Sequence, residues 1–309
     1  MPDTDRSSSA APVSPTEVKP LDAVWSIGLY HGADPLTLQP LDTTSGVGNP
    51  ILTAGDVTDI DCGFVADPIH LAADGVHHLF FEVWNKSLRR GEIALAVSRD
   101  ARTWTYREVV LREPFHLSYP CVFRHEDAFY MIPETRAAQA VRLYRAEAFP
   151  NRWTLVGELL RGDFADATPV RHDGRWWIFA HRGLDELRLF WSNDLAAGWR
   201  EHAANPIVAG NRRLSRPAGR LVVHDNRVLR FAQDAWPHYG SRVRAVAIRD
   251  WTTDVYAEDE VIESPILDGS GHGWNSQGMH HVDFIRRDDR DWLAVVDGYT
   301  LASKPSSRT

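Results

Sequence analysis

Acidic, histidine and arginine residues recur at corresponding places along this chain of 309 residues, and such side chains can perform acid–base chemistry. Six carboxylates fall at the boundaries of short apolar segments: Asp67, Glu82, Glu134, Asp166, Asp234 and Asp297. Histidines and one arginine occupy similar boundaries: His181, His280, His281 and Arg216. A guanidinium can clamp a carboxylate or a phosphate through two parallel hydrogen bonds. The elements between these residues decide whether they meet.

Those elements belong to one repeated unit. Apolar and polar residues alternate over many short segments, which is typical of β-strands, and almost no segment has helical periodicity. Four strand-like segments recur four times, and we expect a tryptophan to open the fourth strand of each unit: Trp104, Trp153, Trp199 and Trp251. A repeat of about 50 residues with four strands is a propeller blade.

A fifth unit begins at residues 278–298 and lacks its outer strands. Residues 23–32, which include Trp25, can supply them, because closing the ring with both ends of the chain removes open sheet edges. We therefore predict an all-β chain that forms a five-bladed β-propeller over residues 21–300, closed by an N-terminal strand. Residues 1–20 and 301–309 are rich in Ser and Pro, and we expect a disordered lead and tail there.

Charge and composition restrict the partners. The formal net charge of −8 argues against nucleic acid or an anionic membrane as partner, and no apolar run is long enough to span a bilayer. The N-terminal residues lack the apolar stretch of a secretory signal, so we expect a cytoplasmic protein. Cys62 and Cys121 fit either a reduced chain or one disulfide. The oligomeric state stays open.

In each blade the innermost strand starts, and the second strand ends, on the same face around the mouth of the central channel. Polar residues there can simply mark where loops begin. Burial near an inner strand makes unpaired charge costly, however, so a functional mouth is the better interpretation. The residues expected to bind a ligand there are Glu82, Trp84, Tyr119, His181, Arg216, Gln233, Asp234, Trp236, Trp274, His281 and Asp297. Of the 12 tryptophans, we expect Trp84, Trp236 and Trp274 to stack on sugar rings.

His280 and His281 are the candidate metal ligands. Adjacent strand residues point to opposite faces, so at most one of the two enters the channel. No cofactor is required by the expected chemistry. A divalent cation such as calcium, bound mainly by oxygen ligands, is compatible with the acidic mouth, and so is a histidine bonded to a carboxylate.

Several strings of the chain resemble one known β-propeller domain. They include VADPIHLAADGVHHLFFE, HLSYPCVFRHEDAFYMIPET and SRPAGRLVVHDNRVLRFAQD, and the similarity runs from about Trp25 to Gly298. This domain occurs alone in bacteria and as the N-terminal domain of plant glucosamine inositolphosphorylceramide transferases. The resemblance implies the propeller fold. It does not imply the transferase activity, which in the plant proteins belongs to a separate C-terminal domain.

More distantly, the chain resembles five-bladed propeller glycosidases of the arabinanase, xylosidase and invertase type. Their pattern is an Asp in the first blade as base or nucleophile, an Asp from the second and a Glu acid from the third. Asp67 matches the first position, whereas the second blade starts with Tyr119 and the third with Asp166. Glycoside cleavage needs an acid and a carboxylate on opposite sides of the anomeric carbon. We expect Asp67 as base or nucleophile, Glu134 as acid, and Asp166 as the group that orients them and tunes their pKa.

The leading hypothesis is thus a glycoside hydrolase-like enzyme that hydrolyses or transfers a glycosidic linkage of a carbohydrate or glycoconjugate. One alternative is a non-catalytic module that recognises a glycan or glycolipid. A further alternative is a propeller recruited as a lyase, cyclase or isomerase in a biosynthetic pathway, because the same acid–base set would serve that chemistry.

Overall fold

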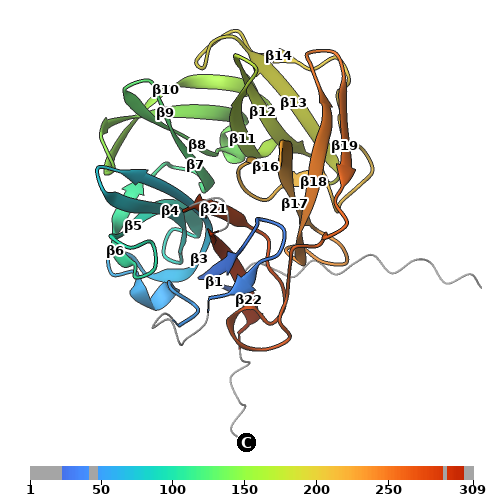
Figure 1. Cartoon of the computed structure of the whole chain (residues 1–309). Coiled ribbons are helices and arrows are strands. Elements are labelled where there is room, and N and C mark those ends of the chain that lie inside the picture. Colours follow the sequence, from blue (N-terminus) through green and yellow to red (C-terminus); the bar gives the residue numbers. More distant parts are fainter. Residues whose placement is uncertain (1–22, 42–47, 288–290, 303–309) are drawn as a thin grey trace, which may run out of the picture.

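The computed structural model describes residues 23–41, 48–287 and 291–302. These residues form five β-sheets arranged as blades around a central channel, as Figure 1 shows. The five-bladed propeller predicted from the repeat is therefore confirmed. The expected disordered lead, residues 1–20, lies outside the described residues, as do residues 303–309 of the expected tail.

Each of the first three blades is an antiparallel sheet with its strands in chain order. Blade one consists of β3 (Cys62–Ala73), β4 (Val76–Asn85), β5 (Arg90–Ser98) and β6 (Thr105–Leu111). Blade two consists of β7 (Ser118–His125), β8 (Ala128–Glu134), β9 (Ala140–Ala148) and β10 (Arg152–Arg161). Blade three consists of β11 (Phe164–His172), β12 (Arg175–Arg182), β13 (Glu186–Ser192) and β14 (Arg200–Glu201).

Blade four has an interrupted inner strand, and blade five joins the two ends of the chain. Blade four contains β15 (Arg216–Pro217), β16 (Val222–His224), β17 (Arg227–Asp234), β18 (Arg242–Trp251), β19 (Tyr256–Glu260) and β20 (Leu267–Asp268). Blade five runs outward from β21 (Val282–Arg286) through β22 (Trp292–Leu301) and β1 (Ala23–Gly32) to β2 (Gln39–Pro40). β1 pairs with β22 over ten residues, so the predicted N-terminal closure is confirmed. Three short 3-10 helices complete the described elements: η2 (Ala54–Asp56), η3 (Arg136–Ala138) and η4 (Gly273–Asn275).

Local sequence explains where the inner hairpins turn. Asp74-Gly75 joins β3 to β4, and Asp173-Gly174 joins β11 to β12, with positive φ at both residues of each turn. Two consecutive residues of positive φ make the turn type whose twist matches a hairpin, and Asp-Gly is a preferred pair there.

Three of the four repeated tryptophans stand where the repeat predicts. Trp104 and Trp199 immediately precede β6 and β14, and Trp153 lies near the start of β10. Trp251 differs, because it is the last residue of the third strand β18 and pairs with Tyr256 of the fourth. The third strand of blade four is longer than its equivalents, which moves this tryptophan across the turn.

The hydrophobic core lies mainly between neighbouring blades. Blades one and five share one cluster that contains Val65 and Val295, and blades one and two share another that contains Phe80 and Met131. Similar clusters fill the other blade interfaces. With the blade faces packed on one another, the beginnings of the inner strands are held together around the channel, where the polar residues gather.

Candidate functional site

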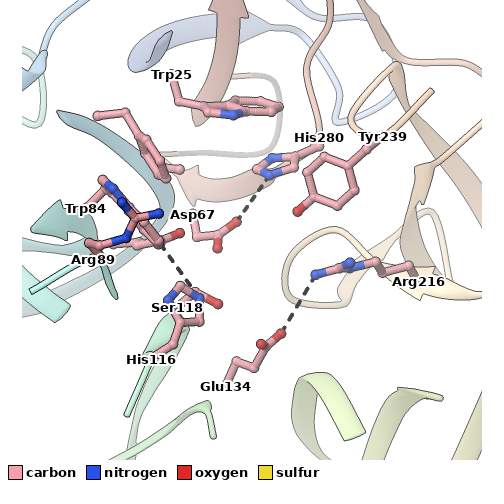
Figure 2. Close-up of a pocket in the computed structure, with 13 residues that line it drawn as sticks. Trp25, Asp67, Trp84, Arg89, His116, Ser118, Glu134, Arg216, Tyr239 and His280 are labelled. Carbon is pink, nitrogen blue, oxygen red and sulfur yellow. Dashed lines mark ion pairs between the residues drawn. The ribbon is translucent and has the colours of Figure 1, made fainter. Parts of the chain in front are cut away.

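A pocket opens at the channel mouth, on the face where the inner strands begin (Figure 2). Its cavity volume is about 320 Å³, which is in the range of a small-molecule site. Side chains from four blades line it: Trp25, Phe64, Ala66, Asp67, Glu82, Trp84, Arg89, His116, Ser118, Glu134, Arg216, Tyr239 and His280. Acidic groups therefore face a cavity whose walls are largely aromatic.

The inner strands of blades one, two and three start with the same irregular backbone. Their pairing with the second strand shifts register after Ala66, Ser118 and Ala165, as in a β-bulge. The next residue in each case has positive φ, namely 54° at Asp67, 44° at Tyr119 and 50° at Asp166. Bulges re-aim side chains beside functional sites, and a bulky residue such as tyrosine rarely adopts this conformation. Asp67, Tyr119 and Asp166 are thus structural equivalents.

The second strands supply a matching ring of polar side chains. Glu82 pairs with Ala66, Glu134 with Ser118, His181 with Ala165 and Gln233 with Arg216. In blade five the Asp297 N–H donates to the carbonyl of His281. All five ring members are buried: Glu82, Glu134, His181, Gln233 and Asp297. The second strand of every blade thus contributes one buried polar side chain to this ring.

Asp67 is held by hydrogen bonds from neighbouring blades. Its Oδ2 accepts the Tyr119 N–H at 3.2 Å, and its own N–H donates to Asp297 Oδ2 at 2.9 Å. Its Oδ1 lies 3.6 Å from His281 Nδ1 and 3.9 Å from His280 Nε2. Burial raises the pKa of Asp67, although the two imidazoles oppose that shift. This carboxyl group is fixed in place and aimed at the cavity.

His280 and Asp297 form an ion pair behind Asp67. The two side chains meet at 2.7 Å, between His280 Nδ1 and Asp297 Oδ1. Burial alone would lower the pKa of His280, but Asp297 outweighs it and raises the pKa. Burial would likewise raise the pKa of Asp297, but the effect of His280 is larger and lowers that pKa. The imidazole ring also stacks on Trp25, with ring centroids 4.0 Å apart.

Glu134, Asp166 and Arg216 form the second charged group of the pocket. Arg216 Nε donates a short hydrogen bond to Asp166, and its guanidinium lies 3.7 Å from Glu134 Oε2 and over the Tyr239 ring. Burial raises the pKa of Glu134 well above its usual value, and the neighbouring Asp166 adds to that shift. Burial would also raise the pKa of Asp166, but Arg216 reverses the direction and lowers it. The pKa values of two adjacent carboxyl groups are thereby shifted in opposite directions.

The candidate metal ligands of the pocket are poorly suited to bind a cation. Atoms of Asp67, His280 and Asp297 lie within 4.8 Å of one another, which is close enough for shared coordination. Asp297 already accepts four N–H bonds, from Asp67 N, His280 N, His281 N and His280 Nδ1. Calcium prefers several free oxygen ligands. These side chains therefore fit an ion pair between histidine and aspartate better than a calcium site.

A match to a family model identifies the protein family of this chain. Residues 19–299 match the model described as glucosamine inositolphosphorylceramide transferase 1, N-terminal. The chain belongs to this family.

Relatives of this N-terminal transferase family include plant proteins named glucosamine inositolphosphorylceramide transferase 1. The Oryza sativa subsp. japonica protein is 35% identical over 92% of this chain and 41% of its own length, and the Arabidopsis thaliana protein is 32% identical over 90% and 39%. The chain thus spans about two-fifths of the length of the relatives it matches.

Several solved structures have a fold similar to that of this chain. They include a Cellvibrio cellulosa alpha-L-arabinanase complexed with arabinohexaose, with a TM-score of 0.54 at 14% identity over 79% of this chain and 96% of that one. The catalytic domain of a Coprinopsis cinerea alpha-L-arabinofuranosidase has a TM-score of 0.55 at 12% identity over 90% of this chain and 98% of that one. At these identities the likeness shows the propeller fold alone. Among the described residues, no helix is long and apolar enough to cross a membrane.

Of the tryptophans expected to stack on sugars, one lines the pocket of this family member. Trp84 stands beside Glu82 at the cavity wall. Trp236 is 42% exposed and lines a separate hollow with Arg212 and Arg213. Trp274 packs against Gly28, where an added Cβ would meet its ring at 2.5 Å. Trp236 lies in a loop and Trp274 in the 3-10 helix η4, and the strand repeat determines the position of neither.

Other expected ligand contacts sit behind the pocket wall. The Tyr119 hydroxyl hydrogen-bonds with Thr168 Oγ1 and accepts the Gly219 N–H, and Asp234 accepts from Arg244 at 2.7 Å. His181 and Gln233 are buried in the second-strand ring, outside the residues that line the cavity. His281 also lies behind Asp67, and both of its ring nitrogens are buried without a hydrogen-bond partner among the described residues.

Seven pocket residues were not expected as site residues: Trp25, Phe64, Ala66, Arg89, His116, Ser118 and Tyr239. Aligning residues 23–32 against β22 would have revealed Trp25, because it pairs with Tyr299, two residues beyond Asp297. His116 precedes the start of β7 by two residues. Arg89 and Tyr239 come from loops and carry no signal in the repeat.

Both cysteines are free thiols, so the reduced alternative applies. Cys121 is buried among apolar side chains between blades one and two, as expected for a packing residue. The Cys62 thiol donates to the Phe64 carbonyl at 3.1 Å, and burial raises its pKa to about 12. A thiol that remains protonated is a poor nucleophile, which excludes Cys62 from the acid–base set.

Proposed function

We propose that the pocket binds a carbohydrate and that its carboxyl groups cleave or transfer a glycosidic bond. The observation that carries this proposal is that Asp67 and Glu134, from neighbouring blades, face one cavity with aromatic walls. Aromatic rings bury the apolar faces of sugars, and carboxyl groups bind their hydroxyls. The sugar-containing names of the plant relatives support this ligand class.

In this proposal Glu134 is the general acid. Its raised pKa favours the protonated form of the carboxyl group, which a general acid needs, and its hydrogen bond with Asp166 orients it. Arg216 keeps Asp166 ionised, so Asp166 does not compete for the same role. Glu134 passes its proton to the leaving oxygen as the bond between that oxygen and the anomeric carbon breaks.

Asp67 acts on the other side of the anomeric carbon. As a base it takes a proton from the attacking water or hydroxyl group, and as a nucleophile it bonds to the anomeric carbon until water or an acceptor displaces it. The Tyr119 N–H and the two nearby imidazoles stabilise its carboxylate form. The same contacts hold its orientation during the reaction.

A panel of aryl glycosides and glycans tests the proposal, with Asp67→Asn and Glu134→Gln as the variants. Each should lower turnover by about 100-fold or more while the protein stays folded. Glu92→Gln is the matched control, since Glu92 is fully buried on β5 and does not line the pocket. Absence of turnover on every substrate, or turnover that both pocket variants retain, would refute a catalytic role.

A non-catalytic glycan-binding module is the second candidate. The observation that favours it is that two blade starts depart from the glycosidase pattern. Tyr119 occupies the second-blade position with its hydroxyl already bonded, and Asp166 occupies the third with its carboxylate bound by Arg216. This candidate predicts sugar binding that survives Glu134→Gln and is lost in Trp84→Ala, with no turnover by the native protein.

A further inference from the structure

Tyr119, at the start of blade two, contacts residues of all four other blades. Its N–H donates to Asp67 Oδ2 of blade one at 3.2 Å. Its hydroxyl lies 2.8 Å from Thr168 Oγ1 of blade three and accepts the Gly219 N–H of blade four at 2.8 Å. Its ring meets the ring of His281, which directly precedes the inner strand of blade five, with centroids 5.1 Å apart. One residue therefore joins the five blades at the channel.

The backbone of Tyr119 has an unfavourable conformation. Its φ of 44° lies in the left-handed region, which a bulky residue rarely adopts. Such strain persists only where the surrounding contacts determine the conformation, and it is typical of functional sites. Tyr119 is 1% exposed and does not line the cavity, so it does not itself touch a ligand there. Its contacts act on residues that face the cavity.

Both hydrogen bonds of the Tyr119 hydroxyl lead toward Asp166. Thr168 Oγ1 donates to the Asp166 carbonyl at 3.1 Å, so the Tyr119 hydroxyl is the donor in its bond with Thr168. Gly219 lies three residues after Arg216, whose guanidinium bonds to the Asp166 carboxylate. The Asp166 backbone and the Asp166 side chain are thus each tied to the same hydroxyl group through one intermediate segment.

The segment that carries Gly219 is rigidly placed. Gly219 has a φ of 130°, and an added Cβ would lie 1.8 Å from the Val282 carbonyl oxygen, so no other residue fits there. The Val282 N–H donates to the Ala218 carbonyl at 2.8 Å. Because this backbone is packed directly on blade five, the Gly219 N–H is a fixed anchor for the Tyr119 hydroxyl.

A neutral side chain suits the position of Tyr119. Burial raises the pKa of Tyr119 well above its usual value, so the hydroxyl keeps its proton. The site already holds many charged groups around Asp67, namely His280, His281, Asp297, Asp166 and Glu82. A carboxylate at this blade start, as in the glycosidase pattern, would add another negative charge beside Asp67. Tyr119 instead connects the carboxyl groups through hydrogen bonds and leaves the charge of the site unchanged.

We propose that Tyr119 is a positioning residue that fixes the Asp67 carboxyl group relative to Asp166 and Glu134 across the cavity. The inference rests on the proposed function, in which Asp67 and Glu134 act on opposite sides of one anomeric carbon. Such chemistry needs its groups held within about 0.5 Å of their working positions. The N–H of Tyr119 holds Asp67 and its hydroxyl holds the segments around Asp166, so a shift of this residue changes the separation of the two carboxyl groups.

Tyr119→Phe tests the inference because it removes the hydroxyl and keeps the ring. Tyr299→Phe is the matched control, since Tyr299 is also 1% exposed and its hydroxyl is buried without a hydrogen-bond partner among the described residues. Carbon-13 NMR titration of the full chain measures the pKa of Asp67, whose carboxyl signal is assigned by its absence in Asp67→Asn. Neither tyrosine variant changes a charged group around Asp67.

We expect the pKa of Asp67 to rise by about 1 in Tyr119→Phe and to stay unchanged in Tyr299→Phe. Without its hydroxyl bonds the strained backbone relaxes, and the N–H that favours the carboxylate form moves away from Asp67. Thr168→Val breaks only the contact toward the Asp166 carbonyl and should raise the pKa of Asp67 less. This second variant serves as the test if Tyr119→Phe does not fold.

Turnover gives the second measurement, with the aryl glycoside of the panel that the native protein cleaves fastest. Tyr119→Phe should lower kcat about tenfold or more with little change in KM, because misplaced groups slow the reaction and leave the ligand contacts intact. An unchanged pKa of Asp67 in Tyr119→Phe, or in Thr168→Val where only that variant folds, would overturn the inference. An equal pKa change in Tyr299→Phe, or a native kcat in Tyr119→Phe, would also overturn it. If the native protein cleaves no compound of the panel, the proposed catalysis fails, and the NMR titration alone decides whether Tyr119 positions Asp67.

Discussion

Arg216→Met tests whether the guanidinium of Arg216 separates the charge states of Asp166 and Glu134. In the native protein Arg216 donates to the Asp166 carboxylate and lies 3.7 Å from Glu134. Methionine has a similar length without the charge. The variant leaves two carboxyl groups side by side in a buried site, and the lowered pKa of Asp166 should then rise.

The expected cost follows from the burial of the pair. Removing one partner of a buried ion pair costs about 3–5 kcal/mol. One-fifth of the Arg216 side chain is exposed, so water already solvates part of it, and we expect the lower end, about 3 kcal/mol at neutral pH. At about 1.4 kcal/mol per pKa unit, this corresponds to a rise of about two units for Asp166.

The pKa shift of Asp166 determines how the stability loss in Arg216→Met changes with pH. A lowered pKa stabilises the native protein above the ordinary pKa of aspartate, and that stability is lost as pH falls through the folded value. In Arg216→Met the pKa of Asp166 is raised instead, so the loss of stability is largest at neutral pH. It should shrink as pH falls toward about 4, where both carboxyl groups bind protons.

Urea unfolding at neutral and mildly acidic pH measures the effect, and Asp166→Asn completes a double-mutant cycle. The double variant should recover most of the loss, because no unpaired charge remains. Arg249→Met is the control, since Arg249 makes its ion pairs with Asp250 and Asp259 on the exposed surface. The reasoning fails if Arg216→Met loses equal stability at both pH values, or if the double variant is as unstable as the single one.

Three further outcomes follow from the site. His280→Gln should lower stability at neutral pH and flatten its decline at alkaline pH in urea unfolding, because the raised pKa of His280 stabilises the native protein only until pH rises through it. The loss of stability that Asp297 contributes at acidic pH should shrink as well, since His280 is the main group that lowers the pKa of Asp297. Trp84→Ala should weaken sugar binding about fivefold or more in calorimetry, while Trp236→Ala, in a separate hollow, should leave affinity unchanged. Added calcium should not shift the melting temperature, because Asp297 already accepts four N–H bonds.

Strand direction and repeat position were enough to find the acidic part of the site. Glu134 ends its second strand, Glu82 and Asp297 lie in the last half of theirs, and Asp67 and Asp166 lie at the same bulge. These positions are a consequence of period-two patterning and of antiparallel pairing, both of which are local properties. The repeat places a residue on a strand end, and the propeller brings all strand ends of one kind to one face.

The pKa shift of each carboxyl group could not be predicted from the repeat. Glu134 and Asp166 differ in the direction of their pKa shifts because Arg216, from another blade, bonds one more closely than the other. Glu82 lies 3.8 Å from His116, and burial lowers the pKa of that imidazole to about 4, so it is neutral at physiological pH. Such effects depend on distances across the channel and on burial.

The aromatic residues of the pocket wall likewise include some that the repeat places and others that only the loops bring in. Sequence alone identified most of the tryptophans as blade architecture and assigned Trp25 to the closing strand. The ten-residue pairing of β1 with β22 then carries Trp25 past Asp297 and onto the pocket, while loop paths bring Tyr239 in and leave Trp236 outside. The number of blades and the acidic strand ends follow from the sequence pattern alone. Which side chains meet in the cavity depends on the folded chain, because loops and bulges take their conformation from contacts far along the sequence.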